Sequence, residues 1–374
     1  SKAQRHAFFA EREANKVPGV TKDVKPRPVN RIAGLGAGTM GGGITMSFAS
    51  AGIPVTIIDL TPEALERGMG IIEKNYRNTQ RRGGLTEAQV DKALANITPS
   101  SNFDDVADAD MVIEAVFENV ELKAKITKMA EAVLDKDAVF GSNTSTLPIT
   151  GLAEASERPE NFIGIHFFSP VERMGLVEII SGEKTSEATL AKAVDYVLAI
   201  RKTPIAVNDS RGFYTSRCFG TYTREGMEML AEGIKPAIIE NVGRQSGMPM
   251  GPLEVSDSVG LDTALKVTRA TAEAAGIDLQ TDDRTQFLAW LVEDQERVGR
   301  KAGKGFYDYN EKGKPERLWP DLNTQLEVKV DECPPDLKKE LTNRFLIRQA
   351  VEVARCFEEG VITDARDADI GSIL

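Results

Sequence analysis

The sequence predicts an α/β fold with a doubly wound, mostly parallel sheet, followed by an all-α helical domain and the start of a second helical repeat. Between Asn30 and Asp209, short apolar runs alternate with helix-period segments, which is typical of a sheet with helices on both faces. From Arg211 onward, amphipathic segments of helical period follow one another without strand-like runs. We therefore place a domain boundary near residue 210.

The predicted elements follow in chain order. Seven apolar runs are predicted as strands, at 31–36, 55–59, 110–117, 138–143, 162–168, 176–180 and 204–208. Helix-period segments between and after them are predicted as helices, at 39–52, 62–83, 120–134, 213–233, 237–247, 261–276 and 285–299. A helix-like stretch from Gln4 to Asn15 precedes a linker rich in proline and lysine, so residues 1–28 read as a tail.

Composition excludes several classes of protein. With 46 basic and 57 acidic residues, the net charge of -11 argues against a nucleic-acid-binding protein, which needs a basic surface. No run of eighteen apolar residues is present, so no membrane-spanning helix is expected. Three scattered cysteines without C-x-x-C spacing favour a reducing compartment, and we expect no disulfide framework and no metal site.

A glycine-rich turn follows the first predicted strand and opens a helix. Its sequence is Gly36-Ala37-Gly38-Thr39-Met40-Gly41, which is G-x-G-x-x-G. Gly36 permits the tight turn, Gly38 lets the backbone approach a pyrophosphate, and Gly41 allows close helix–strand packing. Asp59 ends the next predicted strand at the spacing of a ribose-binding acid, which favours NAD over NADP. Glycines also serve ordinary turns, but strand, turn, helix and acid together predict a Rossmann-type NAD-binding domain.

We divide the chain into four parts. They are the tail and linker at 1–28, the NAD-binding domain at 29–209, a helical substrate or dimerisation domain at 210–312, and a partial second helical domain at 313–374. The last part rests on the similarity of 223–243 to 347–371, since in both a helix ends in Glu-Gly before a second helix starts. Two unrelated amphipathic helices would look alike, so the repeat is a hypothesis.

One histidine and one glutamate are the candidates for proton transfer. His166 and Glu178 lie in neighbouring apolar runs joined by one short connection. A carboxylate inside a strand is costly to bury unless it is paired. A histidine held by a carboxylate could accept the proton of a substrate hydroxyl while a hydride leaves the same carbon. A purely structural ion pair would leave the same pattern.

Eight motifs occur together and in order. They are GAGTMGGGI, VTIID, VIEAVFEN, SNTSTLPIT, HFFSPVERMGLVEII, DSRGFYTSR, GMPMGPLEVSDSVGLD and GRKAGKGFYDY. The chain thereby resembles the 3-hydroxyacyl-CoA dehydrogenase family from about residue 28 to its end. It is most similar to the dehydrogenase part of multifunctional α-subunits of fatty-acid oxidation complexes. In these an enoyl-CoA hydratase module precedes the dehydrogenase and a thiolase is a partner subunit. The resemblance implies a fragment whose tail is the end of the hydratase module.

The resemblance also implies roles for single residues. His166 matches the general base and Glu178 its partner, and Ser145 lies near both nicotinamide and substrate hydroxyl. Ser145 could instead be a helix N-cap before Leu147-Pro148. Further cofactor contacts are implied at Glu118, Lys123 and Lys301. From the pattern alone, the first two would begin a solvated helix and the third would be a surface lysine.

The acyl-CoA side is implied at Asn75, Arg82 and Ser216. The family often has serine and lysine at the first two positions, and some members have asparagine at the third. Lys74, Arg77 and Arg81 lie beside Arg82 on one helix face, where they could meet CoA phosphates or form a solvated face.

The sequence thus predicts an NAD-dependent 3-hydroxyacyl-CoA dehydrogenase of fatty-acid β-oxidation. The alternatives are a related dehydrogenase of a free hydroxy acid, and an inert NAD- or acyl-CoA-binding fragment of a multienzyme. A homodimer is possible, and the expected compartment is the bacterial cytoplasm or the mitochondrial matrix.

Overall fold

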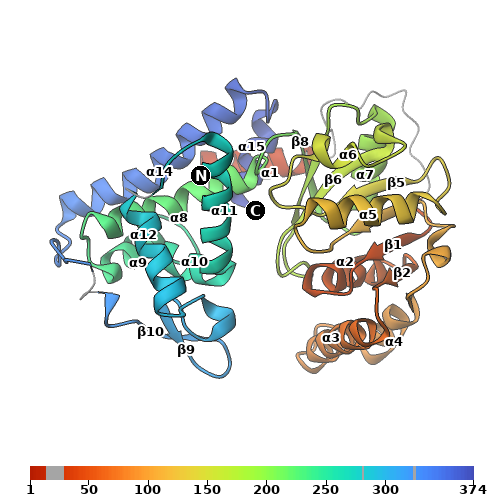
Figure 1. Ribbon diagram of the computed structural model, residues 1–374, viewed down its shortest axis with the longest axis horizontal. Helices are drawn as coiled ribbons and strands as arrows, with labels where there is room; N and C mark the ends of the chain where they lie inside the picture. Colours follow the sequence, from red (N-terminus) through yellow and green to blue (C-terminus); the bar gives the residue numbers. More distant parts are fainter. Residues whose placement is uncertain (14–28, 280–281, 323–325) are drawn as a thin grey trace. The chain divides into compact units, whose positions relative to one another are not determined.

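The computed structural model describes residues 1–13, 29–279, 282–322 and 326–374. It divides into two compact units: Ser1–Ser216 with Arg355–Leu374, and Arg217–Ala354. Figure 1 gives the element labels. The domain borders at 28/29, 209/210 and 312/313 stay predictions, and residues 14–28 of the expected linker lie outside the described residues.

The first unit is built on a sheet in the strand order β3-β2-β1-β4-β5-β6-β7-β8. Every neighbouring pair is parallel except β6 and β7, which run antiparallel. The strands are β1 (Ile32–Leu35), β2 (Val55–Ile58), β3 (Ile97–Ser100), β4 (Met111–Glu114), β5 (Val139–Ser142), β6 (Phe162–Phe167), β7 (Leu176–Ser181) and β8 (Thr203–Asn208). Strand β3 was not predicted, because this edge strand reads ITPS and has no apolar run.

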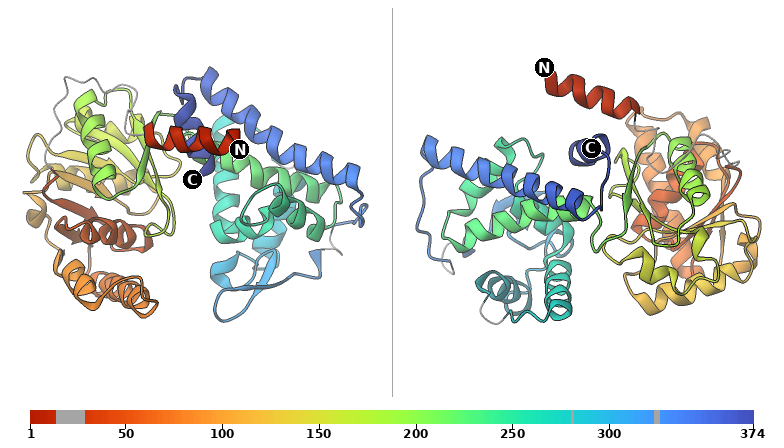
Figure 2. Two further views of the ribbon diagram at one scale, coloured as in Figure 1. Left: turned by 180° about the vertical axis from the view of Figure 1, so that it is seen from behind. Right: turned by 90° about the horizontal axis from the view of Figure 1, so that it is seen from above.

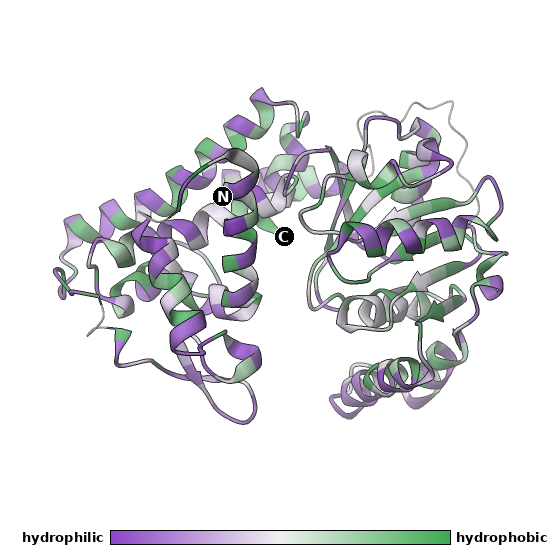
Figure 3. Cartoon of the chain, in the orientation of Figure 1, coloured by the Kyte–Doolittle hydropathy of each residue, from purple (hydrophilic) through white to green (hydrophobic). Residues whose placement is uncertain are grey.

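Helices cover both faces of this sheet (Figure 2). They are α2 (Thr39–Ser50), α3 (Pro62–Arg81), α4 (Glu87–Ala95), α5 (Val120–Glu131), α6 (Ile149–Ala153) and α7 (Glu187–Ala199), with 3₁₀ turns η1 (Phe103–Val106) and η2 (Pro159–Asn161). Helices α2, α3, α4 and α7 share one apolar cluster with the strands. Right-handed crossovers place α5 and α6 on the opposite face, because the strand order reverses direction at β1 and β4. Figure 3 shows α5 alternating between hydrophilic and hydrophobic residues, as a surface helix does.

The edge strand β8 is covered by the C-terminal helix of the chain, on which the N-terminal helix packs in turn. Asp367 in α15 (Ala365–Ile373) accepts a hydrogen bond from the backbone N–H of Ala206 at 3.2 Å. Helix α1 (Lys2–Glu13) in turn packs on α15, where His6 pairs with Asp369. The predicted N-terminal helix is present and begins at Lys2, two residues before the predicted start at Gln4, while residues 14–15 of the prediction lie outside the described residues.

The second unit is mainly helical, and none of the described helices is long and apolar enough to cross a membrane. Its elements are α8 (Thr215–Ala231, which begins in the first unit), α9 (Pro236–Gln245), α10 (Pro252–Val259), α11 (Leu261–Ala275), α12 (Asp283–Ala289), the π turn η3 (Trp290–Asp294), the 3₁₀ turn η4 (Arg300–Ala302), the hairpin strands β9 (Tyr307–Tyr309) and β10 (Pro315–Leu318), and α14 (Pro335–Glu358, which ends in the first unit). The hairpin was not predicted. Buried Asp257 fixes it by accepting the N–H groups of Phe306 and Tyr307.

The two segments behind the repeat hypothesis end their helices in the same way. Gly233 and Gly360 both have left-handed backbone conformations, with φ of 88° and 70°. The residue after each glycine donates its N–H to a carbonyl five residues earlier, Ile234 to Met229 and Val361 to Cys356. This is the Schellman pattern that a glycine after a helix allows, and it also ends other helices of the chain, at Gly52 and Gly276, so the repeat stays a hypothesis.

Candidate active site

The glycine turn between β1 and α2 has the geometry that a dinucleotide requires. Gly36 has a φ of 103°, and a Cβ there would lie 2.8 Å from the carbonyl oxygen of Ala115. A Cβ on Gly41 would lie 1.8 Å from the carbonyl oxygen of Gly36. A Cβ on Gly38, by contrast, would meet no atom within 4 Å, so of the three motif glycines Gly38 alone has open space above its backbone.

The residues at this turn fit the pyrophosphate and ribose of NAD. Helix α2 begins at Gly38 and Thr39 without a side-chain cap, so its first N–H groups and its positive dipole end remain for an anion. Asp59 lies at the turn, where its Oδ2 accepts the N–H of Ala37 at 2.8 Å and its Oδ1 that of Leu60 at 2.7 Å. Each carboxylate oxygen keeps a lone pair for a ribose hydroxyl.

His166 and Glu178 are opposite each other across the antiparallel pair β6–β7. Nδ1 of His166 lies 3.0 Å from Oε2 of Glu178. Glu178 is fully buried and His166 is 6 % exposed. Because a carboxylate can only accept, Nδ1 carries the proton and Nε2 is left as the basic nitrogen.

The buried carboxylate of Glu178 is held by the start of α8. Its Oε1 accepts the backbone N–H groups of Tyr214 at 2.9 Å and Thr215 at 3.0 Å. Its Oε2 also accepts the hydroxyl of Thr215 at 2.6 Å. A helix N-terminus favours negative charge, so these donors offset the cost of burying the carboxylate.

Several predicted site residues meet in one cavity of about 320 Å³ in the first unit. Its lining comprises Met40, Ala115, Val116, Glu118, Asn143, Ser145, His166, Phe167, Phe168 and Ser169. The lining combines residues from the start of α2, the loops after β4 and β5, and the end of β6. All of these strand ends are carboxyl ends, which is where ligands bind in open α/β sheets.

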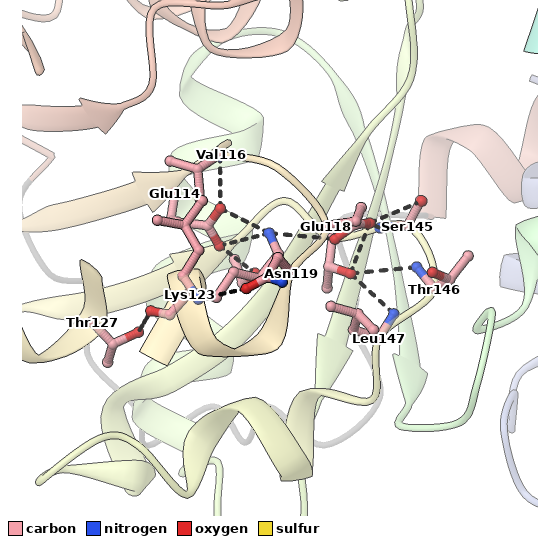
Figure 4. A network of polar contacts seen from close by, with 12 residues as sticks. Glu114, Val116, Glu118, Asn119, Lys123, Thr127, Ser145, Thr146 and Leu147 are labelled. Carbon is pink, nitrogen blue, oxygen red and sulfur yellow. Dashed lines mark hydrogen bonds and ion pairs between the residues drawn. The ribbon is translucent and has the colours of Figure 1, made fainter. Parts of the chain in front are cut away.

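A polar network forms one wall of this cavity (Figure 4). Oε1 of Glu118 accepts the N–H of Ser145 at 2.7 Å, its hydroxyl at 3.1 Å and the hydroxyl of Thr144 at 3.0 Å. Nζ of Lys123 lies 3.4 Å from Oε2 of Glu118. Ser216 is joined to this network, because its hydroxyl donates to the carbonyl oxygen of Ser145 at 3.3 Å.

Two structural alternatives for these residues are wrong. Lys123 is 2 % exposed, so it does not belong to a solvated helix start. Ser145 does not cap a helix either, because the first N–H groups of α6, those of Ile149 and Thr150, bond to Asp209. Thr144, not Ser145, accepts the N–H of Leu147 in the turn.

Other predicted contacts lie elsewhere. Asn75 and Arg82 lie on or just after α3 and do not line the cavity. In the basic stripe, Arg77 is paired with Asp91 at 3.0 Å, while Lys74 is exposed. Lys301 belongs to the second unit, where it is exposed in η4.

The sequence interpretation missed three supporting residues. Glu114 pairs with Lys123, Thr215 holds Glu178, and Asn143 accepts the N–H of Phe167 at 2.8 Å. Of the three, only Glu114 could have been found from the sequence, because it is a glutamate in an apolar strand. Glu178 was singled out for the same reason. No group of three or more His, Cys, Asp or Glu suited to a metal ion occurs in the ranges that the structure covers.

Comparison with known proteins places this geometry in a family. Residues 31–210 match the model of the 3-hydroxyacyl-CoA dehydrogenase NAD binding domain, and 212–309 that of the family's C-terminal domain. The fatty acid oxidation complex subunit alpha of Shewanella loihica is 37% identical over 375 residues, 100% of this chain and 52% of the relative. The chain thus spans about half the length of the curated relatives it matches.

Two solved structures are similar over most of the chain. The (S)-3-hydroxybutyryl-CoA dehydrogenase of Ralstonia eutropha is 34% identical with a TM-score of 0.69, over 76% of this chain and 100% of that one. The dehydrogenase part of multifunctional enzyme 1 from C. elegans is 26% identical with a TM-score of 0.69, over 98% and 85%. Since both family models match in succession and cover most of the sequence, the chain belongs to the 3-hydroxyacyl-CoA dehydrogenase family.

Proposed function

We propose that this chain oxidises an L-3-hydroxyacyl-CoA to the 3-ketoacyl-CoA with NAD, as a step of fatty-acid β-oxidation. The observation that carries the proposal is that His166, which is paired with Glu178, lines the same cavity as Ser145 and Glu118. When bound, the nicotinamide supplies the acceptor for the hydride that leaves C3 of the substrate.

The side chains of the protein transfer the proton of the C3 hydroxyl and orient the substrate and the nicotinamide. Nε2 of His166 takes the proton of the C3 hydroxyl, and Glu178 stabilises the resulting imidazolium. In the reverse direction the same nitrogen returns the proton. Ser145 lines the same cavity as His166, where its hydroxyl can orient the reacting oxygen.

Cofactor binding is assigned to residues of the first unit, with one addition. The pyrophosphate is assigned to the turn of Gly36, Ala37, Gly38, Thr39, Met40 and Gly41. Asp59 binds the adenosine ribose, and Glu118 and Lys123 contact the cofactor ribose and the nicotinamide side. Lys301 of the second unit is a proposed further contact. For the acyl-CoA we keep Asn75, Arg82 and Ser216 as proposed contacts.

The wider setting is also a proposal. We place the chain beside an N-terminal enoyl-CoA hydratase module and a thiolase subunit, and we propose a homodimer. The compartment is the bacterial cytoplasm or the mitochondrial matrix, and the bacterial relative from Shewanella loihica favours the first.

A substrate comparison tests the function. The protein is mixed with NADH and acetoacetyl-CoA, or with NADH and free acetoacetate, and the absorbance of NADH is followed. Consumption with the CoA ester alone is the expected result. Consumption with free acetoacetate would instead select a hydroxy-acid dehydrogenase. NADH binding without consumption of either compound would select the inert fragment.

A further inference from the structure

Lys123 occupies an unfavourable place in the fold. It is 2 % exposed and lies in the first turn of α5, where the positive end of the helix dipole repels a cation. A buried ammonium is tolerated only when it is paired. Both the burial of its charge and its place at the positive end of the helix dipole lower stability, so the presence of Lys123 beside the cavity points to a role in function.

Glu114 is the residue that offsets this cost. Its two carboxylate oxygens lie 2.8 Å and 3.0 Å from Nζ of Lys123. The carboxylate also accepts the hydroxyl of Ser142 at 2.8 Å and the N–H of Val116 at 2.7 Å. Glu114 is 1 % exposed, and neither it nor Lys123 lines the cavity, so it acts on a ligand through Lys123 and Glu118 and not directly.

The ion pair connects to the cavity through Glu118. Lys123 contacts Oε2 of Glu118, whereas Oε1 already receives three donors from Thr144 and Ser145. Figure 4 shows the resulting row from Glu114 through Lys123 and Glu118 to Ser145. Oε2 is therefore the oxygen of Glu118 that has room for a ribose hydroxyl, and Lys123 fixes its position.

We propose that Glu114 is a positioning residue that neutralises Lys123 and thereby sets the preference of the site between oxidised and reduced nicotinamide. This inference rests on the proposed function. The oxidised ring carries a positive charge and the reduced ring does not. Without the charge of Glu114, Lys123 keeps only Glu118 as a carboxylate partner, so the site becomes more positive by one unit and disfavours the oxidised form alone. Burial keeps water from screening this effect.

The test compares the dissociation constants of NAD and NADH for the unmodified chain and for Glu114→Gln. Glutamine keeps the size and one acceptor but removes the charge. We expect NAD to bind more weakly while NADH changes little. The ratio of the dissociation constant of NAD to that of NADH should rise at least roughly tenfold, as a unit charge within about 12 Å produces in an effective dielectric of about 20. A merely structural role would weaken both forms equally.

Two further variants separate charge from packing. Ser142→Ala removes one hydrogen bond from Glu114 and keeps its charge, so the ratio should stay at the unmodified value. The double variant Glu114→Gln with Lys123→Gln restores the net charge and should restore the ratio, even with weaker binding of both forms. Should Glu114→Gln not fold, Lys123→Gln alone must shift the ratio in the opposite direction.

The outcomes also separate this inference from the proposed function. An unmodified chain that binds neither NAD nor NADH overturns both. An unmodified chain that binds and turns over, with the same ratio in Glu114→Gln, overturns the role of Glu114 alone. A ratio that rises equally in Ser142→Ala would likewise show that packing, not charge, is responsible.

Discussion

His166 and Glu178 show how one pair of side chains can be fixed from two sides. The antiparallel register of β6 and β7 places them opposite each other, and the N-terminus of α8 holds the carboxylate. The imidazole therefore has little freedom to turn, and the ring of Phe168 packs 4.5 Å from it, centroid to centroid. A base whose orientation is fixed before the substrate arrives saves reorganisation in the transition state.

The first prediction concerns this base. In His166→Gln we expect turnover to fall by about 10²–10⁴-fold, because glutamine cannot accept the hydroxyl proton. NADH affinity should be retained, since the glycine turn is untouched. Steady-state rates with acetoacetyl-CoA and a fluorescence titration of NADH measure the two quantities.

The chain offers a matched control for that substitution. His6 is the other of the chain's two histidines, and it pairs with Asp369 outside the cavity lining. His6→Gln should therefore turn over like the unmodified chain. Unchanged turnover in His166→Gln would remove the assignment of the base.

At the scale of elements, the turn between β1 and α2 shows three glycines with three different reasons. Gly36 needs its left-handed conformation, Gly41 needs contact with the turn backbone, and Gly38 needs open space for a ligand. The first two reasons belong to folding and the third to binding. Substitution at the first and third positions separates the two roles.

We expect Gly36→Ala to destabilise the chain by about 1–3 kcal/mol, because alanine is strained at positive φ and its Cβ meets the carbonyl of Ala115. Gly38→Ala should leave stability nearly unchanged, since its φ is -73° and no atom lies near its Cβ. Its NADH affinity should nevertheless fall, because the methyl group enters the phosphate space. Urea unfolding and NADH titration give both results, and a Gly38→Ala variant with full affinity would argue against this phosphate site.

At the scale of the whole molecule, stability depends on a carboxyl group far along the chain from the sheet it covers. Burial raises the pKa of Asp367 to about 6, against an ordinary value of 3.8, although the N–H of Ala206 opposes the shift. Because the folded pKa is raised, the folded state binds the proton more tightly than the unfolded state does. Stability is then lost as the pH rises from about 4 through 6.

Asp367→Asn should remove this pH dependence, since the asparagine carbonyl can still accept the N–H of Ala206. Relative to the variant, the unmodified chain should lose about 1–2 kcal/mol of unfolding free energy between pH 4 and pH 7, allowing for partial solvent screening. Urea unfolding at several pH values measures this difference. If the unfolding free energies of the unmodified chain and Asp367→Asn changed equally with pH, the role of Asp367 would be contradicted.

The sequence by itself determined the alternation of strands and helices, the change to helices near residue 210 and the dinucleotide turn. These features are local, because apolar periodicity and glycine spacing act over a few residues. It also singled out His166 and Glu178, since a charge inside an apolar run is visible in the sequence.

Only the tertiary structure decided which distant residues share a wall of the site. The row from Glu114 to Ser145 joins the end of β4, helix α5 and the loop after β5, which meet because these strands are neighbours in the sheet. Edge strand β3 and the Asp209 cap of α6 were likewise invisible, because their stability comes from partners far along the chain. The burial of Lys123 also comes from tertiary packing, since nothing in the sequence distinguishes it from a surface lysine.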